Sequence, residues 1–87
     1  MKNVVIEIRG YVQNVYFRHE AKKLADKLKL KGLIKNHYDW VVAEVEGPED
    51  KLEEFIKWCH RGPVAAKVES VKIEPGTIKG YESFEIN

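Results

Sequence analysis

The segment formed by residues 10–18 carries the feature of this sequence best suited to chemistry. A strand pattern ends at Gly10, a short loop follows, and Arg18 falls in the first turn of a helix predicted to begin at Phe17. A helix N-terminus already bears about half a positive charge, so an arginine there is unfavourable by roughly 0.3–1 kcal/mol unless an anion lies nearby. Free N–H groups and a guanidinium group together could hold a phosphate. We predict an anion site here, although an arginine at a solvated, frayed helix end would show the same spacing.

The same segment resembles the acylphosphatase signature, which runs G-x-V-Q-G-V-x-F-R. Six of its residues match: Gly10, Val12, Gln13, Val15, Phe17 and Arg18. The similarity extends over nearly the whole chain, to Gly32-Leu33-Ile34-Lys35-Asn36, Asp39, Gly47, Gly62-Pro63 with Ala66 and Val68, and Phe84-Glu85-Ile86.

The resemblance implies a hydrolase that cleaves the carboxyl-phosphate bond of acyl phosphates by in-line attack of water. It implies two catalytic side chains, Arg18 to hold the phosphoryl group and Asn36 to position the water. It also implies that loop amides bind the phosphate, those of Gln13, Asn14, Val15, Tyr16 and Phe17. No metal or other cofactor is expected, and the small-molecule partners are an acyl phosphate and inorganic phosphate.

Two catalytic side chains and the loop amides are enough for this reaction, because the leaving carboxylate has a low pKa and needs no general acid. Phosphoryl transfer passes through a loose transition state in most analyses, so catalysis depends mainly on positioning and charge stabilisation. An arginine, main-chain amides and an oriented water can supply both.

Two positions depart from the family pattern. Asn14 replaces a glycine in the middle of the phosphate-binding loop, and Trp40 replaces the glycine of an Asp-Gly turn. If the first glycine has positive φ, asparagine is its least costly replacement. A tryptophan at positive φ would be an outlier, so we expect another turn geometry in the hairpin and expect Trp40 to lie over nearby surface.

The elements that must position these residues follow from the hydrophobic periodicity. Alternation predicts strands over residues 4–8, 33–36, 41–46, 68–73 and 81–86, and helical spacing predicts helices from Phe17 and from the Gly47-Pro48-Glu49-Asp50 start signal. We expect Gly10 to end the first strand and Gly32 to mark the exit from the first helix. The order predicts an α+β, ferredoxin-like βαββαβ fold over residues 1–87, a single domain whose antiparallel sheet has both helices on one face.

Composition narrows the function classes. The 15 lysines and arginines nearly balance 14 aspartates and glutamates, so the net charge of +1 gives no broad field for nucleic acid or an anionic membrane. The first apolar stretch is too short for a signal peptide, and we expect a cytoplasmic monomer. The single Cys59 lies on the predicted buried stripe of the second helix and is interpreted as a core residue.

Two alternatives stay open. A ferredoxin-like RNA-binding module would present aromatic residues on its central strands, whereas residues 41–46 show acidic residues on one face. A phosphate-binding domain that has lost turnover through Asn14 is the second alternative. The three histidines, His19, His37 and His60, share no spacing typical of a site, and we interpret them as surface residues.

Overall fold

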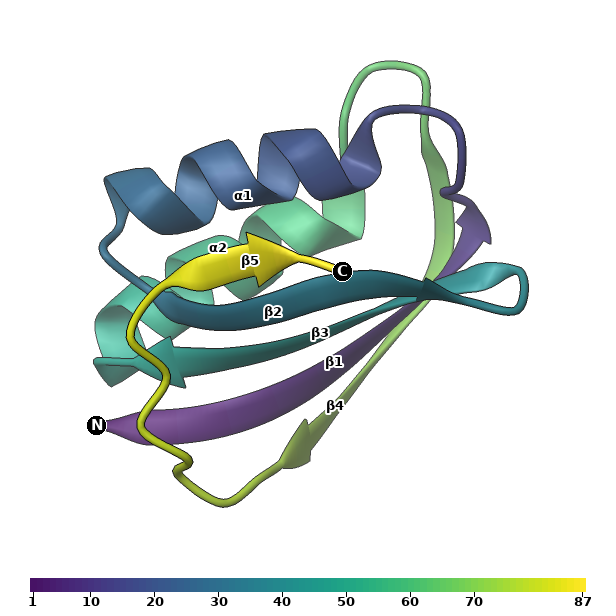
Figure 1. Ribbon diagram of the computed structural model, residues 1–87. Helices are drawn as coiled ribbons and strands as arrows, with labels where there is room; N and C mark the ends of the chain where they lie inside the picture. The colour runs from purple at the N-terminus through teal and green to yellow at the C-terminus, as the bar shows by residue number, and fades with distance from the viewer.

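Two helices lie over one face of a five-stranded sheet in the computed structural model, which describes residues 1–87 (Figure 1). The elements in chain order are β1 (Lys2–Tyr11), α1 (Phe17–Lys27), β2 (Lys31–His37), β3 (Trp40–Gly47), α2 (Glu49–Arg61), β4 (Lys67–Pro75) and β5 (Phe84–Ile86). This arrangement confirms the predicted α+β, ferredoxin-like fold. Neither helix is both long enough and apolar enough to cross a membrane.

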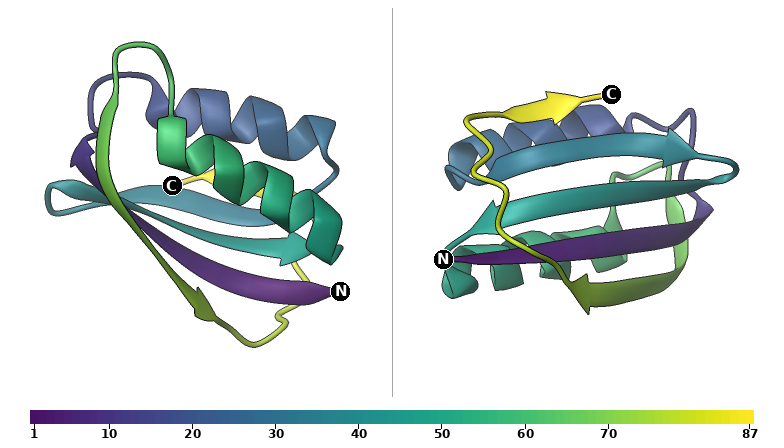
Figure 2. Two further views of the ribbon diagram at one scale, coloured as in Figure 1. Left: turned by 180° about the vertical axis from the view of Figure 1, so that it is seen from behind. Right: turned by 60° about the horizontal axis from the view of Figure 1, so that its bottom comes forward.

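The sheet has the order β4-β1-β3-β2-β5, and it is mixed rather than wholly antiparallel. Strands β1 to β4 pair antiparallel, but β5 runs parallel to β2, with Gly32 opposite Phe84 and Ile34 opposite Ile86. The expected antiparallel pairing therefore holds for β1 to β4, and β5 departs from it. Strands β4 and β5 lie at opposite edges, and residues 76–83 connect them by crossing the sheet face that the helices leave open (Figure 2).

Glu46 holds this crossing segment, residues 76–83, against the sheet. Its buried carboxylate accepts hydrogen bonds from three successive main-chain N–H groups, those of Lys79, Gly80 and Tyr81. These N–H groups are then not available for a strand ladder. Strand β5 spans only Phe84–Ile86, which is shorter than the predicted strand over residues 81–86; the N–H group of Tyr81, the first residue of that prediction, is among those bound by Glu46.

The core lies between the helices and the sheet, where alternate strand residues meet the apolar stripes of both helices. Ile6 and Ile8 of β1, Phe17 of α1, and Phe55 and Cys59 of α2 are at most 1% exposed. Burial raises the pKa of the Cys59 thiol far above its ordinary range. Cys59 is thus a core residue, as its position on the helix predicted.

Two glycines have roles that differ from the predicted ones. Gly10 does not end β1; it lies at a bulge in the β1–β4 pairing, at φ +131°, where a Cβ atom would lie 2.2 Å from the carbonyl oxygen of Lys67. Gly32 is inside β2 at φ +141°, where a Cβ atom would lie 1.9 Å from the Glu44 carbonyl oxygen. Both positions need glycine because another strand passes too close for a side chain.

Candidate active site

The loop between β1 and α1, residues 12–16, has a backbone shaped to surround an anion. Asn14 and Tyr16 have φ values of +62° and +63°, while Val15 between them has negative φ. When successive residues alternate between right-handed and left-handed backbone conformations, their N–H groups point into one concavity. This arrangement is called a nest, and it binds anions. The start of α1 adds the N–H groups and the dipole of a helix N-terminus.

The N–H groups of this loop are not used by the fold. None of those of Gln13, Asn14, Val15 and Tyr16 donates to a main-chain carbonyl, although Tyr16 accepts from Glu20 N–H at 3.0 Å. Unpaired N–H groups are costly to bury and are normally satisfied by water or a ligand. The loop thus has several N–H groups available to a bound group.

The positive φ of Asn14 confirms the conformation expected for an asparagine that replaces a glycine. Its side chain is exposed and makes no hydrogen bond within the protein. The loop therefore has the backbone conformation that glycine would favour, and the Asn14 amide group is free at its mouth.

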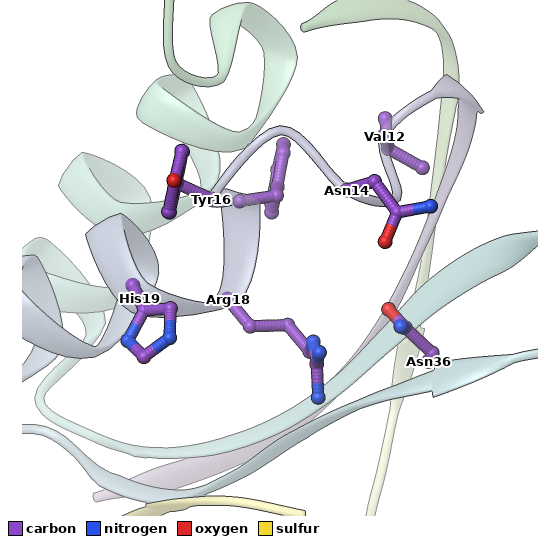
Figure 3. A pocket seen from close by; sticks show the side chains of 7 residues that line it. Val12, Asn14, Tyr16, Arg18, His19 and Asn36 are labelled. Atoms are coloured by element: carbon purple, nitrogen blue, oxygen red, sulfur yellow. The ribbon is translucent and has the colours of Figure 1, made fainter.

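Arg18 and Asn36 meet at one cavity of about 310 Å³ below the β1–α1 loop. Arg18 projects from the first turn of α1 and Asn36 from β2, and in Figure 3 the guanidinium extends toward the Asn36 amide. The cavity is lined by Val12, Asn14, Tyr16, Phe17, Arg18, His19 and Asn36. Two consecutive elements, α1 and the strand β2 that follows it, thus bring the two predicted catalytic residues together.

The Arg18 guanidinium has no carboxylate side chain as a partner. It forms no salt bridge to aspartate or glutamate, and its Nη1 donates a hydrogen bond to the main-chain carbonyl of Asn87 at 3.1 Å. Asn87 is held there because its own N–H donates to the Ile34 carbonyl of β2 at 2.9 Å. An arginine that is held in place by a main-chain oxygen and has no aspartate or glutamate partner is suited to bind an anion bidentately.

The cavity brings together most, but not all, of the side chains predicted for the site. Asn14, Tyr16, Phe17, Arg18 and Asn36 line it, whereas the Val15 side chain is buried in the core. The Gln13 side chain points to the β2–β3 hairpin and donates from Nε2 to the Tyr38 carbonyl at 2.7 Å. Gln13 and Val15 can therefore contribute to the cradle only through their main-chain N–H groups.

Two lining residues, Val12 and His19, were not predicted as site residues. Val12 is a matched position of the signature, and its side chain is buried in the core at the inner wall of the cavity. His19 was interpreted as a surface residue; it is exposed, as expected, but it also lies at the rim of the cavity. Its position directly after Arg18 was the one signal that could have placed it there.

The hairpin beside the site avoids placing Trp40 at positive φ. The positive φ falls on Tyr38 instead, at +54°, and Trp40 is the first residue of β3, opposite His37. The Trp40 ring packs beneath the Arg9 guanidinium, whose carbon is 3.8 Å from the ring centroid. Both expectations for this departure from the family pattern are confirmed.

The described residues contain no group of three His, Cys, Asp or Glu side chains that could hold a metal ion. The donors at the cavity are N–H groups and one guanidinium, and its other polar side chains are amides, a phenol and an imidazole. This set of groups suits a phosphate or another oxyanion better than a cation.

Comparison with known proteins agrees with this chemistry. The family model described as acylphosphatase matches residues 4–86. The acylphosphatase of Nocardioides sp. is 40% identical over 84 residues, which cover 95% of this chain and 85% of that protein. The acylphosphatase of Thermotoga maritima is 39% identical over 87 residues, covering 99% of this chain and 97% of that protein.

A solved structure shows the same likeness in three dimensions. The crystal structure of acylphosphatase from Bacillus subtilis superposes with a TM-score of 0.96 at 34% identity, covering 100% of this chain and 99% of that chain. With the signature loop, Arg18 and Asn36 at one cavity, and with matches of this extent, the chain belongs to the acylphosphatase family.

Proposed function

We propose that this chain hydrolyses acyl phosphates to a carboxylate and inorganic phosphate, with Arg18 and the β1–α1 loop holding the phosphoryl group and Asn36 orienting the attacking water. The observation that carries the proposal is the shared cavity, where the free N–H groups of the loop, the Arg18 guanidinium, which has no aspartate or glutamate partner, and the amide of Asn36 converge.

The phosphoryl group fits the concave side of the β1–α1 loop. Its three non-bridging oxygens carry the negative charge, and they accept hydrogen bonds from the N–H groups of residues 13–17 and from the Arg18 guanidinium. These donors are already in place before the substrate binds, so little reorganisation accompanies the reaction. The charge of the transition state is spread over the same oxygens, and the donors stabilise it there.

The Asn36 amide holds the nucleophile. Its carbonyl oxygen accepts a hydrogen bond from a water molecule and leaves a lone pair of that water directed at phosphorus. The phosphorus–oxygen bond to the carboxylate breaks as the bond from water forms, and the proton of the water passes to a phosphate oxygen or to solvent. No general acid is needed, because a carboxylate leaves unprotonated.

The conformation of Asn14 favours this function over phosphate binding without turnover. The loop keeps the positive φ that a glycine would adopt, so the N–H groups of its neighbours keep their directions.

The broader expectations belong to the same proposal: one acylphosphatase-like domain over residues 1–87, monomeric and cytoplasmic, acting without nucleic acid. The net charge of +1 supports the expectation about nucleic acid, and the burial of Cys59 leaves no accessible thiol that could link two chains.

Hydrolysis of benzoyl phosphate tests the proposal directly. We expect turnover that is unchanged by excess chelator, and much slower cleavage of 4-nitrophenyl phosphate, an ester whose leaving group is a poorer one than a carboxylate. Phosphate binding without turnover would support the inactive alternative. Salt-dependent RNA binding without hydrolysis would support the RNA-binding module instead.

A further inference from the structure

Tyr16 combines two properties that folding does not explain. It has positive φ, +63°, which is uncommon for a bulky residue, and its side chain is 74% exposed. A left-handed conformation costs a typical L-residue free energy that glycine would not lose. An exposed ring at such a position gains little from packing, and strained residues of this kind cluster at functional sites.

The Tyr16 ring forms part of the cavity rim together with His19. Their ring centroids are 6.3 Å apart, with 49° between the ring planes. In Figure 3 these two rings lie on one side of the Arg18 guanidinium, and Asn36 lies on the other. The cavity therefore has an aromatic side and an amide side, with the Arg18 guanidinium between them (Figure 3).

In-line displacement assigns a role to each side. The attacking water and the leaving group lie on opposite sides of phosphorus. If Asn36 holds the water, as the proposed function states, the acyl group must leave on the side away from Asn36. This is the side on which Tyr16 and His19 lie.

A second groove continues the aromatic side. It has a volume of about 790 Å³, and Tyr16 lines both hollows. Trp58, Pro63 and Ala66 are apolar lining residues of this groove, and the charged Glu20 and Arg61 also line it. An acyl group that passes the Tyr16 ring can therefore reach apolar surface at Trp58, which suits an aromatic group better than a single methyl.

We propose that the acyl group of the substrate packs against the Tyr16 ring, and that Tyr16 makes this protein prefer aromatic acyl phosphates over acetyl phosphate. The inference rests on the proposed function, because it uses the position of the water at Asn36. A benzoyl group stacks on an exposed ring with a tilted or offset geometry, whereas an acetyl group offers one methyl.

The test compares two substrates in each variant. The measured quantity is kcat/KM for benzoyl phosphate divided by kcat/KM for acetyl phosphate. We expect Tyr16→Leu and Tyr16→Gly to lower this ratio by about three- to tenfold, the size of effect that one aromatic pair produces. Tyr16→Phe keeps the ring and should keep the ratio. Tyr16→Gly suits positive φ, so it provides a folded variant even if the leucine is poorly tolerated.

Tyr38→Leu is the matched control. Tyr38 is also an exposed tyrosine at positive φ, 82% exposed at +54°, but it lies in the hairpin turn and does not line the cavity. Its replacement should leave the ratio unchanged.

The outcomes separate this inference from the proposed function. If both Tyr16 variants hydrolyse the two substrates with the ratio of the wild type, the acyl group does not contact Tyr16. An equal loss on both substrates would also overturn the inference, because Tyr16 would then act on the phosphoryl group. If the wild type hydrolyses neither substrate, the proposed function itself is wrong.

Discussion

Gln13 joins the β1–α1 loop to the β2–β3 hairpin by donating from its side-chain Nε2 to the main-chain carbonyl of Trp40, at 3.0 Å, and to that of Tyr38. Asn36 lies on β2 immediately before this hairpin. The two hydrogen bonds therefore fix the loop relative to the strand that carries Asn36.

We expect Gln13→Ala to weaken phosphate binding and to lower kcat, because the loop loses its attachment to the hairpin. The free energy of unfolding should fall by about 1–2 kcal/mol, as expected for two hydrogen bonds of modest net strength. Gln13→Glu has nearly the same size but no donor, so it should be at least as harmful. Isothermal titration with phosphate and denaturant unfolding measure the two effects. Unchanged phosphate affinity in both variants would show that the loop holds its shape without Gln13.

Arg18→Ala and Asn36→Ala should separate binding from turnover. Arg18→Ala should abolish both phosphate binding and hydrolysis, whereas Asn36→Ala should keep phosphate binding and lose about 10²–10³-fold in turnover. Phosphate should raise the melting temperature of the wild type and of Asn36→Ala but not of Arg18→Ala, because a ligand stabilises the state that binds it. Equal weakening of phosphate binding in both variants would contradict the proposed division of roles.

A feature of the fold or the site could be predicted from the sequence when the residues that produce it are close together in the chain. The strands of the core and both helices follow from local periodicity, and Arg18 and Asn36 follow from motif positions. The parallel pairing of β5 with β2 and the hydrogen bonds that Glu46 accepts from N–H groups 33 to 35 residues away both join distant parts of the chain, so local periodicity could not predict them. Glu46 looks like an ordinary solvent-facing strand residue in the alternation. The Gln13 contacts have main-chain acceptors 25 and 27 residues away, which no side-chain pattern reveals.

Glu46 should make the stability of the fold depend on pH. Burial raises the pKa of its carboxyl, but hydrogen bonds from Lys79 N–H, the Asn3 amide, and Tyr81 and Gly80 N–H outweigh burial, so the pKa lies below its ordinary value of 4.5. A carboxyl with a lowered pKa stabilises the fold at pH values above the unfolded-state pKa, and this stabilisation is lost as the pH falls through the folded-state pKa. The free energy of unfolding should therefore decrease as the pH falls below about 4.5.

Glu46→Gln tests this origin of the pH dependence. At neutral pH we expect it to cost about 1–3 kcal/mol, because the crossing segment loses charge-assisted hydrogen bonds. Its stability should vary less with pH in the acidic range than that of the wild type. Glu74→Gln is the control: Glu74 is exposed on β4, contacts Lys72 at 3.3 Å, and should change stability by about 0.5 kcal/mol or less. Equal acid sensitivity of wild type and Glu46→Gln, measured by denaturant unfolding from pH 3 to pH 7, would assign the effect to other carboxyls.

The last prediction concerns Asn14, which combines positive φ with a free side chain at the mouth of the cavity. Asn14→Gly removes the strain of the left-handed conformation but also gives the unfolded chain more freedom, and these effects oppose each other. We expect the free energy of unfolding to change by less than about 1 kcal/mol in either direction. Turnover should rise, because substrate reaches the loop N–H groups without a side chain beside it.

Lys29→Gly is the control for the effect on stability of placing a glycine at a positive-φ position, as Asn14→Gly does. Lys29 is also exposed and at positive φ, +60°, but it follows α1 at the end remote from the cavity. Both glycine variants should therefore change stability to a similar degree, while Asn14→Gly alone changes turnover. Benzoyl phosphate kinetics and denaturant unfolding of the two variants distinguish the effects. A fall in turnover for Asn14→Gly would show that the Asn14 amide takes part in holding the substrate, because its side chain has no hydrogen bond within the protein to lose.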